Sequence, residues 1–412
     1  MCKPLWKNKN IRFYVLAGCI SRLGDALTGM AFLFLAYDLT GSNLLTTVMA
    51  AAETVPYLLF GLIGGVTADW MQKKKWLIQL DIIRVPIVLS VVVLSSIGWL
   101  TFTYLLTASF LLQSIGCFFN PAHRSVLPLI TDENERISVN SLYDSLTRGI
   151  TILSPVVSIW LLNTYGAVHF FTVDALTYVT SALFLYQVTI KEKEHAVQKS
   201  LTGMVEAIKE FADWTRTQPV IRRLFLFTFI TVFFNTWVWE VGLLLALAEM
   251  SGRSEELYSM LQGVFGGVVI LTNTVLPLFF KKLTFSHYLI GALIWGTGIF
   301  YYGIFFNVPH FFIGCAIVGI GLPLAGLTRI YILQSLIPEE KMGRAFSLNA
   351  VLLYLANTIS LAVYGTLASF LSIQYLMIGS GSVMVLVSMI SLLIYTVDTA
   401  KFGRRFLINF FK

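Results

Sequence analysis

The feature that most constrains this chain is a series of long apolar runs that repeats along the whole sequence. Of its 412 residues, 57% are hydrophobic and only 12% are charged, whereas a soluble domain carries about 25% charged residues. Each run has the length of about 20 residues that a helix needs to cross a bilayer. The sequence therefore predicts an all-α integral membrane protein.

We expect twelve transmembrane helices. The first run contains Arg22 and Asp25 and has no small-residue cleavage site of the signal-peptide kind, so we expect it to be retained as a span. The expected spans are 12–37, 44–68, 77–97, 100–120, 138–162, 167–190, 221–247, 257–280, 286–306, 310–335, 344–370 and 374–397.

Positive charges are distributed unevenly between the two ends of these spans. Most of the 29 Lys and Arg residues lie in the terminal segments and in the links that follow even-numbered spans. Because Lys and Arg favour the cytoplasmic side, we expect a multi-pass protein of the inner membrane with both termini in the cytoplasm. The net charge of +7 then reflects the Lys and Arg residues that set the orientation of the spans in the membrane, and we expect no nucleic-acid partner.

The longest polar interval, about 191–218, divides the spans into two groups of six. Within it, Leu201, Val205, Ile208 and Ala212 recur at helical spacing, which indicates an amphipathic helix on the cytoplasmic surface. A flexible linker is the alternative. The expected organisation is an N-terminal six-helix bundle over 1–190, a linker with an amphipathic helix over 191–220, and a C-terminal six-helix bundle over 221–412.

The end of the second span carries a recognisable signature. Gly65 and Asp69 are followed by the basic pair Lys73–Lys74. This spacing resembles the loop signature between spans two and three of the major facilitator superfamily, with Trp70 and Gln72 in place of an Arg and a second Gly. The twelve spans, the long central link and similar links after the fourth and tenth spans resemble the same superfamily.

Short phrases narrow the resemblance to the bacterial exporter branch that includes macrolide-efflux and enterobactin-exporter-like proteins. The phrases are Ser21-Arg22-Leu23-Gly24-Asp25, Asp81-Ile82-Ile83-Arg84, Asn120-Pro121-Ala122-His123-Arg124, Asp174-Ala175-Leu176 and Pro338-Glu339-Glu340-Lys341-Met342-Gly343-Arg344. The resemblance implies twelve helices in two six-helix bundles, a small-molecule substrate, and a proton gradient in place of any cofactor. It also implies that Asp69 meets the start of span eleven near Arg344, with Gly65 beside it, and gates the cytoplasmic side.

Charged side chains within the spans are the candidates for mechanism, because an ionised group in lipid is costly. Three intramembrane pairs lie three or four residues apart and can neutralise each other: Arg22 with Asp25, Asp81 with Arg84, and Asp144 with Arg148. Glu53 and Glu240 have no such local partner. We expect Asp25, Glu53 or Glu240 to couple proton entry to substrate exit, with Glu240 first because apolar residues follow it.

A substrate cavity is expected between the halves, near the middle of the membrane. Its candidate wall mixes aromatic and polar side chains, which suits an amphipathic, ring-bearing solute. The candidates are Tyr57, Gln113, Asn235, Trp237, Trp239, Asn273 and Arg329. The four cysteines and five histidines share no spacing of metal ligands, so no metal site is expected.

These patterns predict a secondary active transporter, acting as a monomer in the lipid bilayer, that exports a small amphipathic compound such as a macrolide-like drug. Unpaired arginines keep open the export of an anionic metabolite such as a siderophore or metallophore, and a lysolipid is a further alternative. A lipid-acting membrane enzyme is disfavoured because neither a His-Glu-x-x-His nor a Gly-x-Ser-x-Gly motif occurs. A channel is disfavoured because the two-half repeat suits alternating access.

Overall fold

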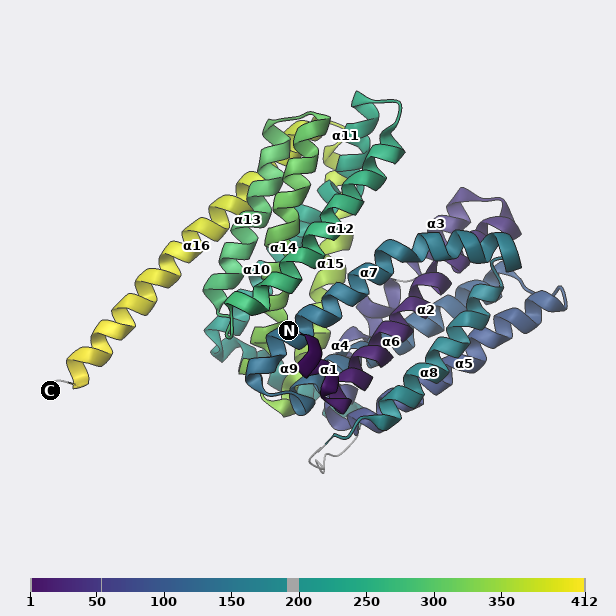
Figure 1. Cartoon of the computed structure of the whole chain (residues 1–412), viewed down its shortest axis with the longest axis horizontal. Coiled ribbons are helices and arrows are strands. Elements are labelled where there is room, and N and C mark those ends of the chain that lie inside the picture. Colours follow the sequence, from purple (N-terminus) through teal and green to yellow (C-terminus); the bar gives the residue numbers. More distant parts are fainter. Residues whose placement is uncertain (1, 53, 191–199, 411–412) are drawn as a thin grey trace. The chain divides into compact units, whose positions relative to one another are not determined.

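The computed structural model describes residues 2–52, 54–190 and 200–410, with side chains for 5–52, 54–190, 200 and 202–395. Within these residues every regular element is a helix, as Figure 1 shows. Contacts among the helices divide the chain into two compact units. The first unit comprises Met1–Arg222 and Leu333–Tyr354, and the second comprises Arg223–Ile332 and Leu355–Lys412.

The first unit is built from the N-terminal helices and a short segment from late in the chain. Its helices are α1 (Cys2–Lys7), α2 (Lys9–Thr40), α3 (Asn43–Ala51), α4 (Val55–Trp70), α5 (Lys73–Ser96), α6 (Phe102–Ile130), α7 (Glu133–Tyr165), α8 (His169–Gln187), α9 (Leu201–Thr217) and the 3₁₀ turn η2 (Glu339–Lys341).

The second unit holds most of the remaining helices. They are α10 (Pro219–Trp237), the π-helical turn η1 (Val238–Gly242), α11 (Leu243–Met250), α12 (Ser254–Phe279), α13 (Phe285–Ile304) and α16 (Ile373–Phe410). Two long helices pass from one unit into the other, namely α14 (Val308–Leu336) and α15 (Met342–Leu367). Helix α15 therefore contributes residues to both units.

The described residues contain ten helical segments that are long and apolar enough to cross a membrane. Two further helices, α8 and α13, have 19 and 20 residues, which is spanning length, but tyrosine and threonine residues make them less apolar. These two occupy the sixth and ninth expected spans. The second expected span is formed by α3 and α4 in succession, with Pro56 at the first turn of α4, where a proline is tolerated.

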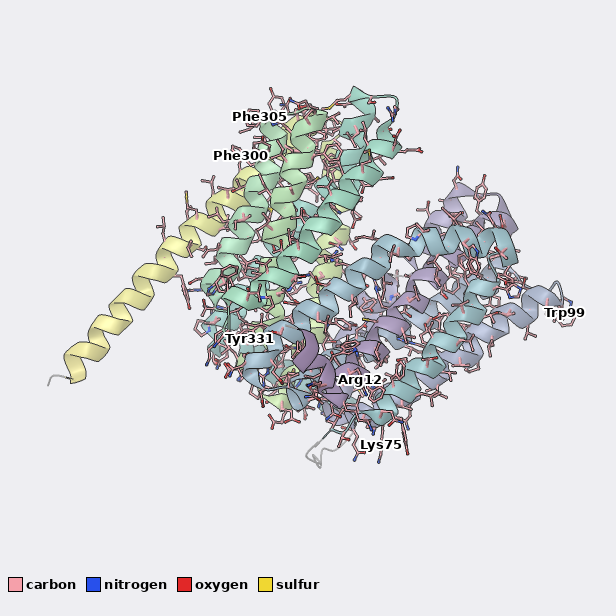
Figure 2. All side chains as sticks on the ribbon, in the orientation of Figure 1. Arg12, Lys75, Trp99, Phe300, Phe305 and Tyr331 are labelled. Atoms are coloured by element: carbon pink, nitrogen blue, oxygen red, sulfur yellow. The ribbon has the colours of Figure 1, made fainter. Side chains whose placement is uncertain are left out.

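The helix ends in the first unit follow from local chemistry. Asp132 caps α7 in a capping box with Glu135, which satisfies two backbone donors of the first turn. Gly41 ends α2 in the left-handed region with φ of 59°, a conformation that glycine adopts without strain. Figure 2 shows Arg12 and Lys75 near one end of this unit and Trp99, just beyond α5, at the other. Arg12 and Lys75 therefore lie at the same end of this unit.

The first unit contains two apolar cores with a polar boundary between them. Along α2 the first core ends at Cys19 and the second begins at Leu27, and along α5 the corresponding residues are Leu80 and Val88. The boundary falls near the middle of both helices. At this boundary, and on the adjoining part of α8, lies a group of side chains that we call the polar belt: Asp25 on α2, Asp81 and Arg84 on α5, and Asp174 and Tyr178 on α8, where Tyr178 also belongs to the second core.

Candidate functional site

A carboxylate at the end of α4 meets the first turn of α15, within the first unit. Oδ1 of Asp69 accepts a hydrogen bond of 2.5 Å from the backbone N–H of Gly343. Oδ2 of Asp69 accepts one of 3.2 Å from the backbone N–H of Arg344 and one of 2.9 Å from Nε of Arg344. The first N–H groups of a helix have no partners within the helix, so they favour an anion. We call this the α4–α15 contact.

A glycine one turn earlier on α4 makes this approach possible. A Cβ atom on Gly65 would stand 2.5 Å from Cβ of Ser347 and 2.8 Å from Cα of Arg344. Any larger residue would therefore push α4 away from α15. The structure thus places Gly65, Asp69 and Arg344, the three residues that the sequence resemblance selected for the gate, in one contact.

The surface helix α9 also reaches this contact. Nη1 of Arg344 donates to the carbonyl oxygen of Ala207 and to Oε2 of Glu210, both at 2.8 Å. Nζ of Lys341 forms an ion pair with the other carboxylate oxygen of Glu210. These hydrogen bonds from Lys341 and Arg344 hold the pKa of Glu210 below its usual range.

The polar belt contains one buried ion pair. Nη1 of Arg84 lies 3.6 Å from Oδ1 of Asp81, and the two side chains are 3% and 0% exposed. The hydroxyl of Ser181 donates to Oδ2 of Asp81 at 2.7 Å. The guanidinium of Arg84 also stacks between two aromatic rings, 4.8 Å from the centre of Phe119 and 5.1 Å from that of Tyr178, which stabilises a buried cation.

Two further carboxylates belong to the belt and are held by hydroxyl groups. Tyr178 donates a hydrogen bond of 2.9 Å to Asp25. Thr28 and Thr177 donate to Asp174 at 2.7 and 3.0 Å. Gly24 allows α2 to approach α8 here, because a Cβ atom on it would lie 2.1 Å from Oδ1 of Asp174.

The belt opens onto a cavity of about 470 Å³ inside the first unit. That volume is within the range of small-molecule sites, about 300–1,000 Å³. Its wall includes five residues selected from the sequence: Arg22, Asp25, Tyr57, Arg84 and Gln113.

An aromatic pair lines part of this cavity. The rings of Tyr57 and Tyr354 are stacked, with centroids 4.1 Å apart, and Asn120 donates to the hydroxyl of Tyr57 at 2.6 Å. The cavity thus combines stacked aromatic rings, amides and charges.

The other cavity candidates lie in the second unit. Asn235 accepts a hydrogen bond of 2.9 Å from the indole of Trp295. Trp237 and Asn273 are buried, and Trp239 and Arg329 are half-buried. The structure therefore divides the candidate residues between the units, with Tyr57 and Gln113 in the first.

The three selected ion pairs differ in geometry. Arg84 and Asp81 form the buried pair described above, and Nε of Arg148 lies 3.9 Å from Oδ2 of Asp144 in a more exposed position. Asp25 instead accepts its hydrogen bond from Tyr178. Its neighbour Arg22 is exposed along the cavity wall.

The side chain of Glu240 is partly exposed in the structure. Glu240 lies within the π-helical turn η1. Such a turn contains one residue more than an α-helical turn and rotates its side chains away from the face that regular helical spacing predicts. Glu53 lies outside the described residues. The roles of both glutamates in proton coupling stay predictions.

No group of three or more His, Cys, Asp or Glu side chains within the described residues could hold a metal ion.

The family model described as transmembrane secretion effector matches residues 3–402. The chain belongs to this family. It is therefore a secondary transporter of the major facilitator superfamily and not an enzyme.

The relatives of this chain are distant and cover most of its length. Macrolide efflux protein A of Streptococcus pyogenes is 23% identical over 394 residues, which cover 93% of this chain and 96% of the relative. Multidrug efflux pump Tap of Mycolicibacterium fortuitum is 22% identical over 367 residues, covering 86% and 88% of the two chains. The predicted resemblance to an exporter branch of the superfamily is confirmed.

Solved structures confirm the predicted fold class of this chain. A bacterial homologue of the iron transporter ferroportin, in its outward-facing state, aligns with a TM-score of 0.75 at 14% identity, covering 92% of this chain and 98% of the other. The fucose:proton symporter of E. coli aligns with a TM-score of 0.72 at 12% identity, covering 93% and 99%. At such identities the likeness concerns the fold alone.

Several residues of the polar belt, the cavity wall and the α4–α15 contact were not identified from the sequence. Thr177 follows Asp174 by three residues, so a hydroxyl one turn from a buried carboxylate was an available signal. Tyr178, four residues after Asp174, offered the same signal, whereas Glu210 and Tyr354 had none, because tertiary packing alone brings their partners to them.

Proposed function

We propose that the protein exports a small amphipathic compound by alternating access and that proton entry drives the export. The observation that supports this most is the polar belt, which brings together three carboxylates, those of Asp25, Asp81 and Asp174, and a single guanidinium, that of Arg84, which pairs with Asp81. The names of the two relatives, a macrolide efflux protein and a multidrug efflux pump, support transport in the outward direction.

The charge balance of the belt suits proton coupling. One guanidinium compensates one carboxylate, and uncompensated charge is costly in an apolar interior. We therefore propose that the remaining carboxylates carry the protons that are exchanged as the cavity opens to water and closes. Asp25 lines the cavity, so it can exchange a proton with water and respond directly to a bound substrate.

The α4–α15 contact is proposed to act as the gate on the cytoplasmic side. Lys73–Lys75 follow α4 directly, and such basic residues favour the cytoplasmic face. Both termini are then cytoplasmic in a membrane-spanning monomer with six-helix halves over 1–190 and 221–412. Because α15 continues beyond Tyr354 into the second unit, holding its first turn restrains the movement that alternating access requires.

The test measures proton release on addition of a macrolide to proteoliposomes that contain the purified protein and a pH-sensitive dye. Asp25→Asn and Asp174→Asn are expected to abolish substrate-driven proton release while the protein still binds macrolide. Asp144→Asn is the matched control, because it removes a membrane carboxylate outside the belt. Glu53→Gln and Glu240→Gln test the two glutamates. Unchanged proton release in both belt variants would overturn coupling through the belt.

An anionic compound is the second candidate substrate. Arg22 lines the cavity, and no hydrogen bond or ion pair joins its guanidinium to another residue in the described part of the chain. Such a group favours carboxylate or catecholate ligands. The same proteoliposomes, with a catecholate siderophore in place of the macrolide, distinguish the two classes, and Arg22→Gln should weaken binding of the siderophore alone.

A further inference from the structure

The surface helix α9 presents one carboxylate to two cations at the start of α15. Glu210 accepts a 2.8 Å hydrogen bond from Nη1 of Arg344 through one oxygen and pairs with Nζ of Lys341 through the other. Beside it, the carbonyl oxygen of Ala207 accepts a second bond from Arg344 at 2.8 Å. A helix that precedes the second unit in sequence is thus bound to the α4–α15 contact.

These bonds fix the orientation of the Arg344 side chain. Its Nε donates to Asp69 at 2.9 Å, Nη1 donates to α9, and Nη2 donates to the carbonyl oxygen of Glu340 at 2.7 Å. The ring of Phe211 on α9 lies 5.9 Å from the guanidinium carbon. Because a guanidinium is a planar fork, fixing Nη1 on one side also fixes the direction in which Nε points.

The exposed fractions of the three side chains indicate which interaction contributes most of the stabilising energy. Asp69 and Arg344 have side chains that are 2% and 8% exposed, whereas the Glu210 side chain is 58% exposed. The buried pair therefore carries most of the interaction energy. Glu210, in contact with solvent, contributes a smaller direct term and acts by holding Arg344 in place.

We propose that Glu210 is a positioning residue of the gate and that α9 must release Arg344 before the α4–α15 contact can open. This inference rests on the proposed gate function of that contact. Glu210 acts through Arg344 on Asp69, so removing its charge weakens the closed state only while Asp69 can bind Arg344.

A matched control lies one turn away on the same helix. Glu206 and Glu210 both line a cavity of about 630 Å³ between α9 and the α4–α15 contact. Glu206 is also exposed, but within the described residues it forms no hydrogen bond or ion pair. Glu206→Gln and Glu210→Gln therefore make the same change of charge on the same helix, and only the second removes bonds to Arg344.

The experiment is a labelling assay in inside-out vesicles, which expose the cytoplasmic face. A reporter cysteine replaces Gln113 on the cavity wall in a chain without its natural cysteines, and a membrane-impermeant maleimide reports access to it. An exposed ion pair contributes little, so we expect Glu210→Gln to raise the labelling rate about two- to fivefold. Glu206→Gln should leave the rate unchanged, and Glu210→Asp should restore part of the closure.

The double variant separates positioning from general stabilisation. In an Asp69→Asn background, Glu210→Gln should have no further effect on labelling, because its target is gone. Equal labelling in the Glu206 and Glu210 variants, or an undiminished Glu210 effect in the Asp69 background, would overturn this inference. An Asp69→Asn variant that labels like the parent chain would instead overturn the gate itself.

Discussion

Replacing Asp69 with asparagine should raise the ratio of open to closed gate by about two orders of magnitude without changing substrate affinity. The carboxylate accepts three hydrogen bonds, at 2.5, 2.9 and 3.2 Å. Asparagine keeps the shape of the side chain, but it loses the charge and one of its two acceptor oxygens. The amide in that position points a donor at the donors of α15.

The magnitude follows from burial. Each hydrogen bond to a charged group contributes about 1.5–3 kcal/mol. Because the side chains of Asp69 and Arg344 are only 2% and 8% exposed, solvent does not screen the pair appreciably. A net loss of about 3 kcal/mol is therefore expected, which corresponds to roughly a 100-fold shift between the two states.

The maleimide labelling assay at position 113 measures this shift. Labelling of Asp69→Asn from the cytoplasmic side should accelerate by up to about 100-fold, since a 3 kcal/mol change sets that limit, while transport turnover falls. The dissociation constant of the substrate should stay unchanged, because Asp69 does not line the 470 Å³ cavity. Asp213→Asn, which removes a carboxylate from an exposed pair, is the control. A loss of substrate affinity with unchanged turnover and labelling would refute the gate.

Three further predictions use the same protein. Gly65→Ala should open the gate like the Asp69 variant, because its Cβ would stand 2.5 Å from a side-chain atom of α15. The control is Gly149→Ala, which has open space around it and should show the same maleimide labelling rate as the parent chain. Gly24→Ala should lower thermal stability by about 1–3 kcal/mol through overpacking, measured by heating in detergent, because its Cβ would lie 2.1 Å from Asp174. The hydrogen bonds to Glu210 lower its pKa. Its stabilisation of the closed gate is therefore fully present above about pH 4.3, the pKa of a free glutamate. The stabilisation is lost as the pH falls through the lower pKa of the bound carboxylate. A labelling difference between the parent chain and Glu210→Gln that disappears already at pH 6 would contradict this.

The sequence was informative wherever a local or periodic rule applied. A bilayer requires about 20 apolar residues per helix, so composition alone indicated a polytopic helical fold, and solved structures of the superfamily confirm it. The pairs Asp81 with Arg84 and Asp144 with Arg148 follow from helical spacing, and the structure places both within 4 Å.

Local rules failed where the backbone or the packing departed from regularity. Glu240 lies within the π-helical turn of η1, an irregularity of the backbone that regular helical spacing does not reveal. The second expected span consists of two helices, α3 and α4, and α4 begins at Val55 with Pro56 in its first turn. Both departures occur inside spans that the hydropathy pattern located correctly, because hydropathy reports the solvent around a helix and not its internal geometry.

The Gly65–Asp69 motif at the end of α4 illustrates what the sequence and the tertiary structure each decided. The sequence by itself determined a small residue and a carboxylate four positions apart at the end of a span, Gly65 and Asp69, because helical spacing puts such residues on one face. Only the tertiary structure decided that Glu210 on α9 and Asp69 on α4 bind the same guanidinium of Arg344. Those residues are separated by more than a hundred positions, and no local periodicity encodes which surface a helix packs against.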